Sequence, residues 1–250
     1  MKTDEREQRI ISILESRGEM PVNALGDILG VSVSTLRKQL AAMQSKGLVI
    51  RTYGGVMSVN RVPDESFDSK LHKSVSEKRL IAARARALIP DGAVIFLGSG
   101  TTVYSLSNML DDLKQGTVYT NSMQTADYLA RCASLEVHIC GGIIRSATGT
   151  IIGNETTEYF RRRTADYAFI SCDAIDSNGN VYNDNLAVAT AEQDIIRNAK
   201  HKYVLCDPSK LGKSSVAKII SLSDCDGLIT CRTSSGIDEI YSFVTNVIYA

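Results

Sequence analysis

Tryptophan is absent from this chain of 250 residues, and aromatic residues make up only 6% of it. Proteins that bind single-stranded nucleic acid stack the bases on aromatic side chains, so this composition argues against that class. The formal net charge is zero, because 28 basic residues balance 28 acidic ones. Any contact with nucleic acid must therefore come from a local excess of positive charge and not from the field of the whole protein.

Long apolar runs are missing as well. No stretch approaches the roughly 18 apolar residues that a membrane-spanning helix needs. The N-terminal residues, MKTDEREQR, are charged and lack the apolar core of a signal peptide. The hydrophobic fraction of 44% is normal for a globular protein with a sizeable core. We therefore expect a soluble, cytoplasmic protein.

The cysteines lack the spacing of a metal site. The chain has six of them, with no C-x-x-C pair and no His/Cys cluster at ligand spacing. Several lie in apolar, strand-like runs, and disulfides are rare in cytosolic proteins, so buried reduced thiols are expected. The sequence predicts neither a metal site nor a cofactor. The cysteines are Cys132, Cys140, Cys172, Cys206, Cys225 and Cys231.

Acidic residues are absent from residues 28–61. All six acidic residues of the first sixty lie at or before Asp27. This segment is the one that would face a phosphate backbone, since phosphate contacts are made by basic side chains. Its basic residues are Arg37, Lys38, Lys46, Arg51 and Arg61.

Two short helical patterns precede the basic segment. Asp4–Arg17 has apolar residues on one face and acids in its first turn, where the helix dipole favours them. Pro21 fits the first position of a second helix, which the apolar spacing carries to Leu29 and which Gly30 ends. A tight glycine-containing turn between two short helices is the helix-turn-helix pattern.

The helix after Gly30 carries the polar groups. Leu36, Leu40 and Met43 share one face with Val33, and Ser32 stands at the expected N-cap. The other faces hold hydroxyls and long donors, which are the side chains that reach phosphates and base edges. The apolar runs 48–53 and 56–59, joined through Gly54-Gly55, then predict a β-hairpin beside the helices.

Residues 9–56 resemble the DNA-binding domain of the DeoR family of bacterial transcriptional regulators. That family's recognition helix reads V-S-x-x-T-I-R-R-D-L and is followed by G-x-x-x-R-x-H-G-G-A. The chain matches at Val31-Ser32, Thr35-Leu36-Arg37, Leu40, Gly47, Arg51 and Gly54-Gly55-Val56, and departs at Lys38, Gln39 and Tyr53. Lysine contacts phosphate but cannot make the planar bidentate contact of arginine, so the operator sequence is open. The expected DNA contacts are Ser32, Ser34, Thr35, Arg37, Lys38, Lys46, Arg51 and Tyr53.

We predict a winged helix-turn-helix domain at residues 1–60, a linker at 61–75 and a second domain at 76–250. The linker is polar, contains Pro63 and shows no helical period. In the second domain, helical and strand-like segments alternate, which is typical of an α/β domain with a mainly parallel sheet. The expected strands are Val94–Leu97, Thr117–Thr120, Val137–Cys140, Tyr167–Ile170, Tyr203–Cys206 and Leu228–Thr230.

Small polar turns follow the first three of these strands, and charged residues follow later ones. In a parallel sheet these turns meet at the carboxyl edge, where open α/β folds bind ligands. Backbone amides and hydroxyls at a helix start suit an anion, and carboxylates with a lysine suit sugar hydroxyls and phosphate. The candidate effector residues are Gly98, Ser99, Gly100, Thr101, Thr102, Thr120, Asn121, Ser122, Gly141, Gly142, Asp173, Asp176, Glu192 and Lys210.

This second region is similar to the C-terminal sensor domain of the DeoR family, which is related to the ribose-5-phosphate isomerase/CoA-transferase fold. The resemblance rests on Gly100-Thr101-Thr102, Thr120-Asn121-Ser122, Gly141-Gly142, Gly153, Asp176, Gly179, Glu192, Asp207, Ser209 and Lys210. It departs at Gly98, Ser171-Cys172 and Cys231. The resemblance implies a repressor of carbohydrate-metabolism genes that binds double-stranded operator DNA as a homo-oligomer, a dimer or tetramer, and responds to a phosphorylated sugar.

Two other functions remain open at this stage. A sugar-phosphate isomerase with an appended DNA-binding module would use Glu192 as a base and Lys210 to hold an oxyanion. A multimeric DNA-organising protein would have no effector at all. We expect binding without catalysis, because a sensor can keep such groups purely for binding.

Overall fold

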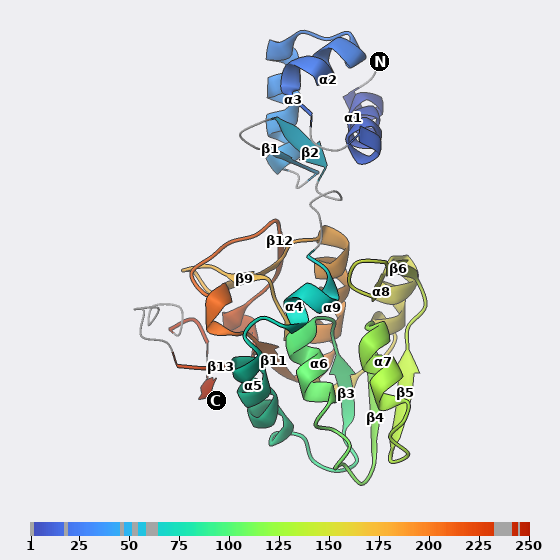
Figure 1. The fold of residues 1–250 in the computed structure, drawn as a ribbon, viewed down its shortest axis with the longest axis vertical. Coiled ribbons are helices and arrows are strands. Elements are labelled where there is room, and N and C mark those ends of the chain that lie inside the picture. The colour runs from blue at the N-terminus through green and yellow to red at the C-terminus, as the bar shows by residue number, and fades with distance from the viewer. Residues whose placement is uncertain are drawn as a thin grey trace. The chain divides into compact units, whose positions relative to one another are not determined.

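The computed structural model describes residues 3–17, 20–45, 48–51, 55–58, 65–232, 242–244 and 246–250. It divides the chain into two compact units, Met1–Asp64 and Glu65–Ala250, which we call unit 1 and unit 2 (Figure 1). The fold class is the expected α/β, with a helical N-terminal region and a parallel sheet in the second unit.

Unit 1 contains the three predicted helices and the predicted hairpin. Its core is one cluster in which Leu36, Leu40 and Met43 pack with Ile10 and Leu14 of the first helix. Pro21 lies one residue before the second helix, at its N-cap, while Gly30 ends that helix in the left-handed conformation, as predicted. The elements are α1 (Thr3–Arg17), α2 (Val22–Leu29), α3 (Val33–Ser45), β1 (Val49–Arg51) and β2 (Val56–Ser58).

The hairpin is tied to the helices through Met20. β1 and β2 pair antiparallel, and Val56 and Met20 exchange two backbone hydrogen bonds of 2.9 Å each. A Cβ on Gly55 would lie 2.0 Å from the Met20 carbonyl oxygen, so only glycine allows this approach. The rest of the predicted turn, residues 52–54, lies outside the described residues.

Unit 2 is built on a seven-stranded sheet in the order β14-β13-β11-β8-β3-β4-β5. Every pairing within it is parallel, and all six predicted strands belong to it. The seven strands are β3 (Val94–Leu97), β4 (Gly116–Thr120), β5 (Leu135–Ile139), β8 (Ala165–Ser171), β11 (Ala199–Leu205), β13 (Gly227–Thr230) and β14 (Val247–Tyr249).

Side chains alternate between two cores, one on each face of this sheet. In β3, Ile95 and Leu97 pack into one cluster and Phe96 into the other. Strands buried on both faces read as nearly continuous apolar runs, as β3 does. The first face is covered by α5 (Val75–Arg86), α6 (Thr101–Ser107) and α7 (Met123–Leu129), and the second by α8 (Asn154–Arg161) and α9 (Leu186–Arg197) (Figure 1).

Two smaller antiparallel sheets complete unit 2, and the sequence did not predict them. One is a hairpin of β6 (Ile143–Arg145) and β7 (Thr150–Ile152). The other has the order β12-β10-β9, formed by β9 (Ala174–Ile175), β10 (Asn180–Asn183) and β12 (Ala217–Ser221). Strands of two to five residues are too short to show a period of their own.

The predicted linker is shorter than expected, because its second half is structured. Residues 67–71 form helix α4 (Phe67–Leu71), and Ser66 caps it by accepting from the Ser69 amide. Phe67 is buried and meets Tyr104 of α6 edge-on at 5.3 Å between ring centroids. One turn of helix cannot reveal itself by periodicity, which is why the sequence indicated a linker there.

All six cysteines are free; five are buried and Cys132 is partly exposed. The predicted burial is therefore confirmed for five of the six. Among the residues that the structure describes, no helix has both the length and the apolar character to cross a membrane.

Candidate functional site

The outer surface of α3 carries the predicted DNA contacts. Ser34, Thr35, Arg37 and Lys38 are all exposed, whereas Leu36, Leu40 and Met43 of the apolar face are fully buried. Burial of one face holds the helix in a single rotation, so the donors project outward together. The helix has no acidic residue in its first turn, so nothing there repels a phosphate.

The first turn of α3 is organised by Ser32. Its Oγ accepts from the Thr35 amide at 3.3 Å and lies 2.8 Å from Thr35 Oγ1. The N-cap prediction is thus confirmed. Exposed hydroxyls and a positive dipole end together form a surface that suits a phosphate group.

Other predicted contacts in unit 1 are only partly described. Arg51 is exposed at the end of β1. Gln39, where the family pattern has Asp, accepts a hydrogen bond from Arg6 of α1 at 3.5 Å, so it joins α3 to α1. Lys46 and Tyr53 lie outside the described residues.

In unit 2, the chain order of the strands creates a topological switch point between β3 and β8. From β3 the sheet grows through β4 and β5 in one direction, and from β8 through β11, β13 and β14 in the other. The loops that leave β3 and β8 therefore diverge, which opens the place where ligands of such sheets bind.

The loop after β3 wraps around the carboxyl group of Glu192 from α9. Glu192 Oε1 accepts from the Ser99 amide at 2.8 Å and from Ser99 Oγ at 2.9 Å. A Cβ on Gly98 would lie 2.1 Å from Glu192 Oε2, so the glycine at this position is what lets the carboxyl group in. Gly100, at φ 101°, makes the next close approach, to Ser171 Oγ at the end of β8.

Glu192 is a buried carboxyl group with an unsatisfied oxygen. Its side chain is 1% exposed, and Oε2 has no hydrogen-bond partner among the described residues. Burial raises the pKa of Glu192 to about 8, and the two bonds from Ser99 only partly oppose that rise. At neutral pH the group is therefore largely protonated and can donate a hydrogen bond as well as accept one.

Asp173 is the centre of a charged cluster beside Glu192. Its Oδ1 accepts from Lys70 Nζ of α4 at 2.6 Å and lies 3.9 Å from Lys210 Nζ. Its charge also acts on Arg145 of β6 and on Glu192. Burial lowers the pKa of Lys70, but the attraction of Asp173 outweighs this and raises it overall.

A further lysine lies beneath this cluster. Lys78 of α5 is 4% exposed, and its Nζ donates to the Lys70 carbonyl. Burial lowers the pKa of Lys78, while the charge of Asp207 opposes that change. Four cationic side chains, Lys70, Lys78, Arg145 and Lys210, therefore surround the switch point.

Sequence reasoning named only one of these four cations. Lys70 and Lys78 were not among the candidate effector residues, and nothing in the sequence placed them near Asp173, which is 103 residues from Lys70. Arg145 lies in a hairpin that has no period to predict.

The second and third polar turns meet at the β6–β7 hairpin. Asn121 and Ile151 are joined by a backbone bond of 2.7 Å, and Ser122 caps α7 by accepting from Thr125. Asn121 is fully buried, and its Oδ1 has no partner among the described residues. Gly142 fits against the Ile152 carbonyl, where a Cβ would be 2.4 Å away. Because Arg145 lies on this hairpin, these turns border the charged cluster.

The Asp176 carboxylate is hydrogen-bonded within its own hairpin, that of β9 and β10. It accepts from the amides of Asn178 and Asn180, from the Asn180 side chain and from the Tyr182 hydroxyl. Burial alone would raise the pKa of Asp176, but these bonds outweigh it and lower the pKa. The residue shapes the turn between β9 and β10, and its role in ligand binding stays a prediction.

Comparison with protein families decides what kind of molecule carries these two sites. A family model described as the DeoR C terminal sensor domain matches residues 73–232, and one described as the DeoR-like helix-turn-helix domain matches residues 6–62. The chain belongs to the DeoR family. The expectation from the sequence is confirmed, and the protein is a DNA-binding transcriptional regulator of that family.

Relatives within the DeoR family align over nearly the whole chain. A putative aga operon transcriptional repressor of Escherichia coli O157:H7 is 30% identical over 91% of this chain and 86% of its own length. An uncharacterized HTH-type transcriptional regulator, FruR, of Bacillus subtilis is 29% identical over 92% of both chains. The glycerol-3-phosphate regulon repressor of E. coli K12 is 25% identical over 92% of this chain and 91% of its own.

Among solved structures, a ribose 5-phosphate isomerase A from Methanocaldococcus jannaschii aligns with 54% of this chain and 53% of its own. The TM-score is 0.40 and the sequence identity 21%.

Proposed function

We propose that this DeoR-family protein represses genes of carbohydrate metabolism in the cytoplasm, and that a phosphorylated sugar bound to unit 2 controls its affinity for operator DNA. It binds the operator as a homo-oligomer, through α3 and the hairpin of unit 1. Two of the relatives support the assignment by name, as repressors of the aga operon and of the glycerol-3-phosphate regulon.

The cluster at the switch point is the observation that carries this proposal. Lys70, Arg145 and Lys210 lie close to Asp173, and Lys78 lies close to Asp207. Asp184 and Glu65 also act on Lys70, and the carboxyl group of Glu192 is largely neutral at pH 7. Cationic side chains bind phosphate, and Lys210 and Arg145 of this cluster are placed to contact it. Asn121 Oδ1 and Glu192 Oε2 are buried and have no hydrogen-bond partner within the described part of the chain, so they suit sugar hydroxyls.

Helix α4 offers a route from this cluster toward the DNA-binding unit. It is the first element of unit 2 after the connection, and its Lys70 binds Asp173 directly. Phe67 also donates its amide to the Ala147 carbonyl at 2.9 Å, at the turn of the β6–β7 hairpin. A ligand that binds Asp173 displaces Lys70 and so frees α4 from the cluster. Such a ligand binds the arrangement with α4 released more tightly than the arrangement with α4 attached. This difference in affinity is what allows a ligand to control DNA binding.

The test is a screen of phosphorylated sugars against the matching unphosphorylated sugars by thermal unfolding, followed by gel shift. Ligands raise apparent stability by RT ln(1 + [L]/Kd), so a phosphorylated sugar at about 100 Kd should stabilise the protein by about 2.7 kcal/mol. The same compound should change operator binding at fixed salt. If no phosphorylated sugar shifts unfolding, the protein organises DNA without an effector and the proposal is wrong.

Binding without turnover is part of the proposal. Glu192 Oε1 is held by both Ser99 donors, which favours a fixed recognition group over a base that must move a proton. Incubating the purified protein with pentose phosphates and following isomerisation by NMR checks this. Conversion at an enzymatic rate would assign the isomerase function instead.

A further inference from the structure

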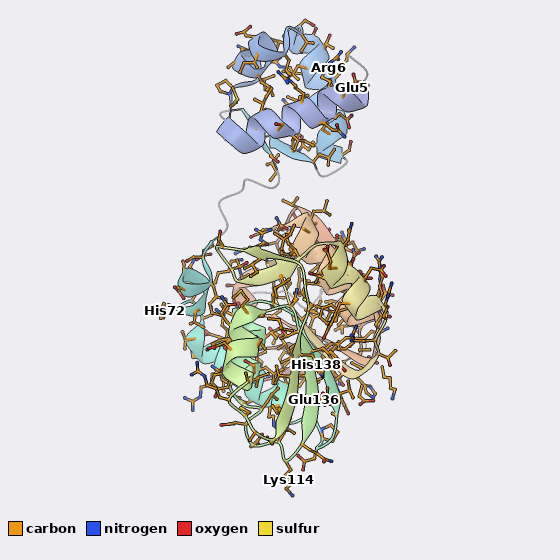
Figure 2. The ribbon with its side chains drawn as sticks, turned by 90° about the vertical axis from the view of Figure 1, so that its right-hand side faces the viewer. Glu5, Arg6, His72, Lys114, Glu136 and His138 are labelled. Carbon is orange, nitrogen blue, oxygen red and sulfur yellow. The ribbon has the colours of Figure 1, made fainter. Side chains whose placement is uncertain are left out.

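Strand β5 forms one border of the seven-stranded sheet, and its outer edge is uncovered in the described part of the chain. It pairs with β4 alone. Figure 1 shows it at the margin of the sheet, and Figure 2 looks onto that margin, with Glu136 and His138 labelled on the strand. Its five residues, LEVHI, contain no lysine, proline or glycine, which are the residues that usually protect such an edge.

The backbone of β5 presents a defined set of hydrogen-bonding groups at this edge. The Cys140 amide donates to the Thr120 carbonyl of β4, so the even-numbered residues of the strand direct their backbone groups inward. The groups of Leu135, Val137 and Ile139 therefore point outward. Of these, the Leu135 amide is used by the Cys132 carbonyl.

We propose that β5 is the surface on which a second copy of this chain docks, by antiparallel pairing about a two-fold axis through Val137. In this register the two Val137 residues exchange two hydrogen bonds. Each Ile139 amide then donates to the partner's Leu135 carbonyl, which is the acceptor left free at that end. Every outward group of the strand except the Ile139 carbonyls is satisfied, and the two sheets become one.

Charge selects this register over its neighbours. Glu136 and His138 project from the same face and already contact each other at 2.9 Å. Centring on Val137 sets each Glu136 opposite the His138 of the other copy, whereas centring on Glu136 would oppose two carboxylates. The His138 ring is held in place by stacking on Tyr119, 4.6 Å between centroids.

Apolar exposure near the end of β5 agrees with a protein partner. Ile139 is 45% exposed, and Ile143 and Ile144 of the following hairpin are 66% and 54% exposed. Large apolar side chains so open to solvent, next to an unpaired strand edge, are typical of an interaction surface. A self-complementary edge identifies the partner as the same chain, because a two-fold contact uses the same patch on both copies.

The experiment uses two charge variants of the full chain and measures mass by sedimentation velocity. H138E makes the edge acidic, and the double variant E136K/H138K makes it basic. Each alone should dimerise at least about tenfold more weakly than the wild type, because like charges face each other twice. A 1:1 mixture should restore the dimer, since each Glu then faces a Lys.

Folding of the variants is checked by thermal unfolding, and unit 2 by its response to the effector of the proposed function. An intact ligand response with lost dimerisation separates this inference from that function. Three results would overturn the inference. The first two are a monomeric wild type at tens of micromolar and variants that keep the wild-type mass. A mixture that stays monomeric would equally assign the dimer to another surface.

Discussion

The two units differ in how far their candidate binding residues are exposed to solvent. In unit 1 the expected DNA contacts Ser34, Thr35, Arg37 and Lys38 stand exposed on α3, and the apolar side chains of that helix are buried. In unit 2 the expected effector residues are mostly buried, with Ser99, Thr101, Thr102 and Asn121 each less than a tenth exposed. A DNA duplex is too large to be enclosed, whereas a small ligand can be surrounded. Substitutions should therefore change binding alone in unit 1, and binding together with stability in unit 2.

The strongest test of this contrast is the pH dependence that Glu192 confers on unit 2. The pKa of Glu192 is about 8 in the folded protein, whereas the ordinary value for a glutamate, which applies to the unfolded chain, is 4.5. The folded state therefore binds the proton more tightly. The free energy of unfolding should then fall as pH rises from about 4.5 to about 8, by up to about 1.4 kcal/mol per pH unit. Urea unfolding at pH 5.5, 6.5, 7.5 and 8.5 measures this slope.

Glu192→Gln should remove that slope, because the amide does not titrate. The exposed Glu155→Gln serves as the matched control and should leave the slope as it is. Equal slopes in the wild type and Glu192→Gln would show that the buried carboxyl group does not titrate in this range.

A glycine pair tests how closely the loop after β3 is packed. Gly98→Ala should destabilise unit 2 by about 1–3 kcal/mol, since its Cβ would lie 2.1 Å from Glu192 Oε2. Gly141→Ala is the control, because a Cβ there meets nothing within 4 Å. Thermal unfolding of both variants distinguishes a packed site from an open loop, and equal melting temperatures would contradict the packing argument.

In unit 1 the corresponding substitution should leave stability unchanged. Arg37→Ala should weaken operator binding by about 1–3 kcal/mol, or roughly fivefold to 150-fold, because an arginine contact to a base or phosphate is lost. Gel shift at fixed salt measures this, and effector affinity should not change. Gln44→Ala, exposed on the same helix, is the control. Unaltered operator binding by the arginine variant would remove α3 from the DNA interface.

The smallest effect is expected where the two units communicate. Lys70→Met removes the ion pair with Asp173 and should reduce the coupling between effector and operator by about 1–2 kcal/mol. The protein should still bind both ligands separately. Lys73→Met, from the exposed pair with Glu65 on the same segment, should keep full coupling. Operator titrations with and without effector compare the two, and equal coupling would exclude α4 as the route.

Local signals predicted much of the fold. Apolar spacing predicted the three helices of unit 1, and apolar runs predicted six strands of the large sheet. Gly30 predicted the end of α2, and Ser32 predicted the start of α3. Each of these signals is contained in a few consecutive residues. The elements that were missed are α4, β14 and the strands of the two small sheets. They are too short for a period, and α4 is held by a long-range contact of Phe67 on Tyr104.

The sequence by itself determined the family, the two-domain order and the residue types at the carboxyl ends of the strands, because motifs and periodicity are local. Only the tertiary structure decided that Lys70, Arg145 and Lys210 converge on Asp173, and that Glu192 enters the loop at Gly98. Strand order brings such distant residues together, and burial then sets the charge they carry. Neither strand order nor burial is written in any single stretch of the chain.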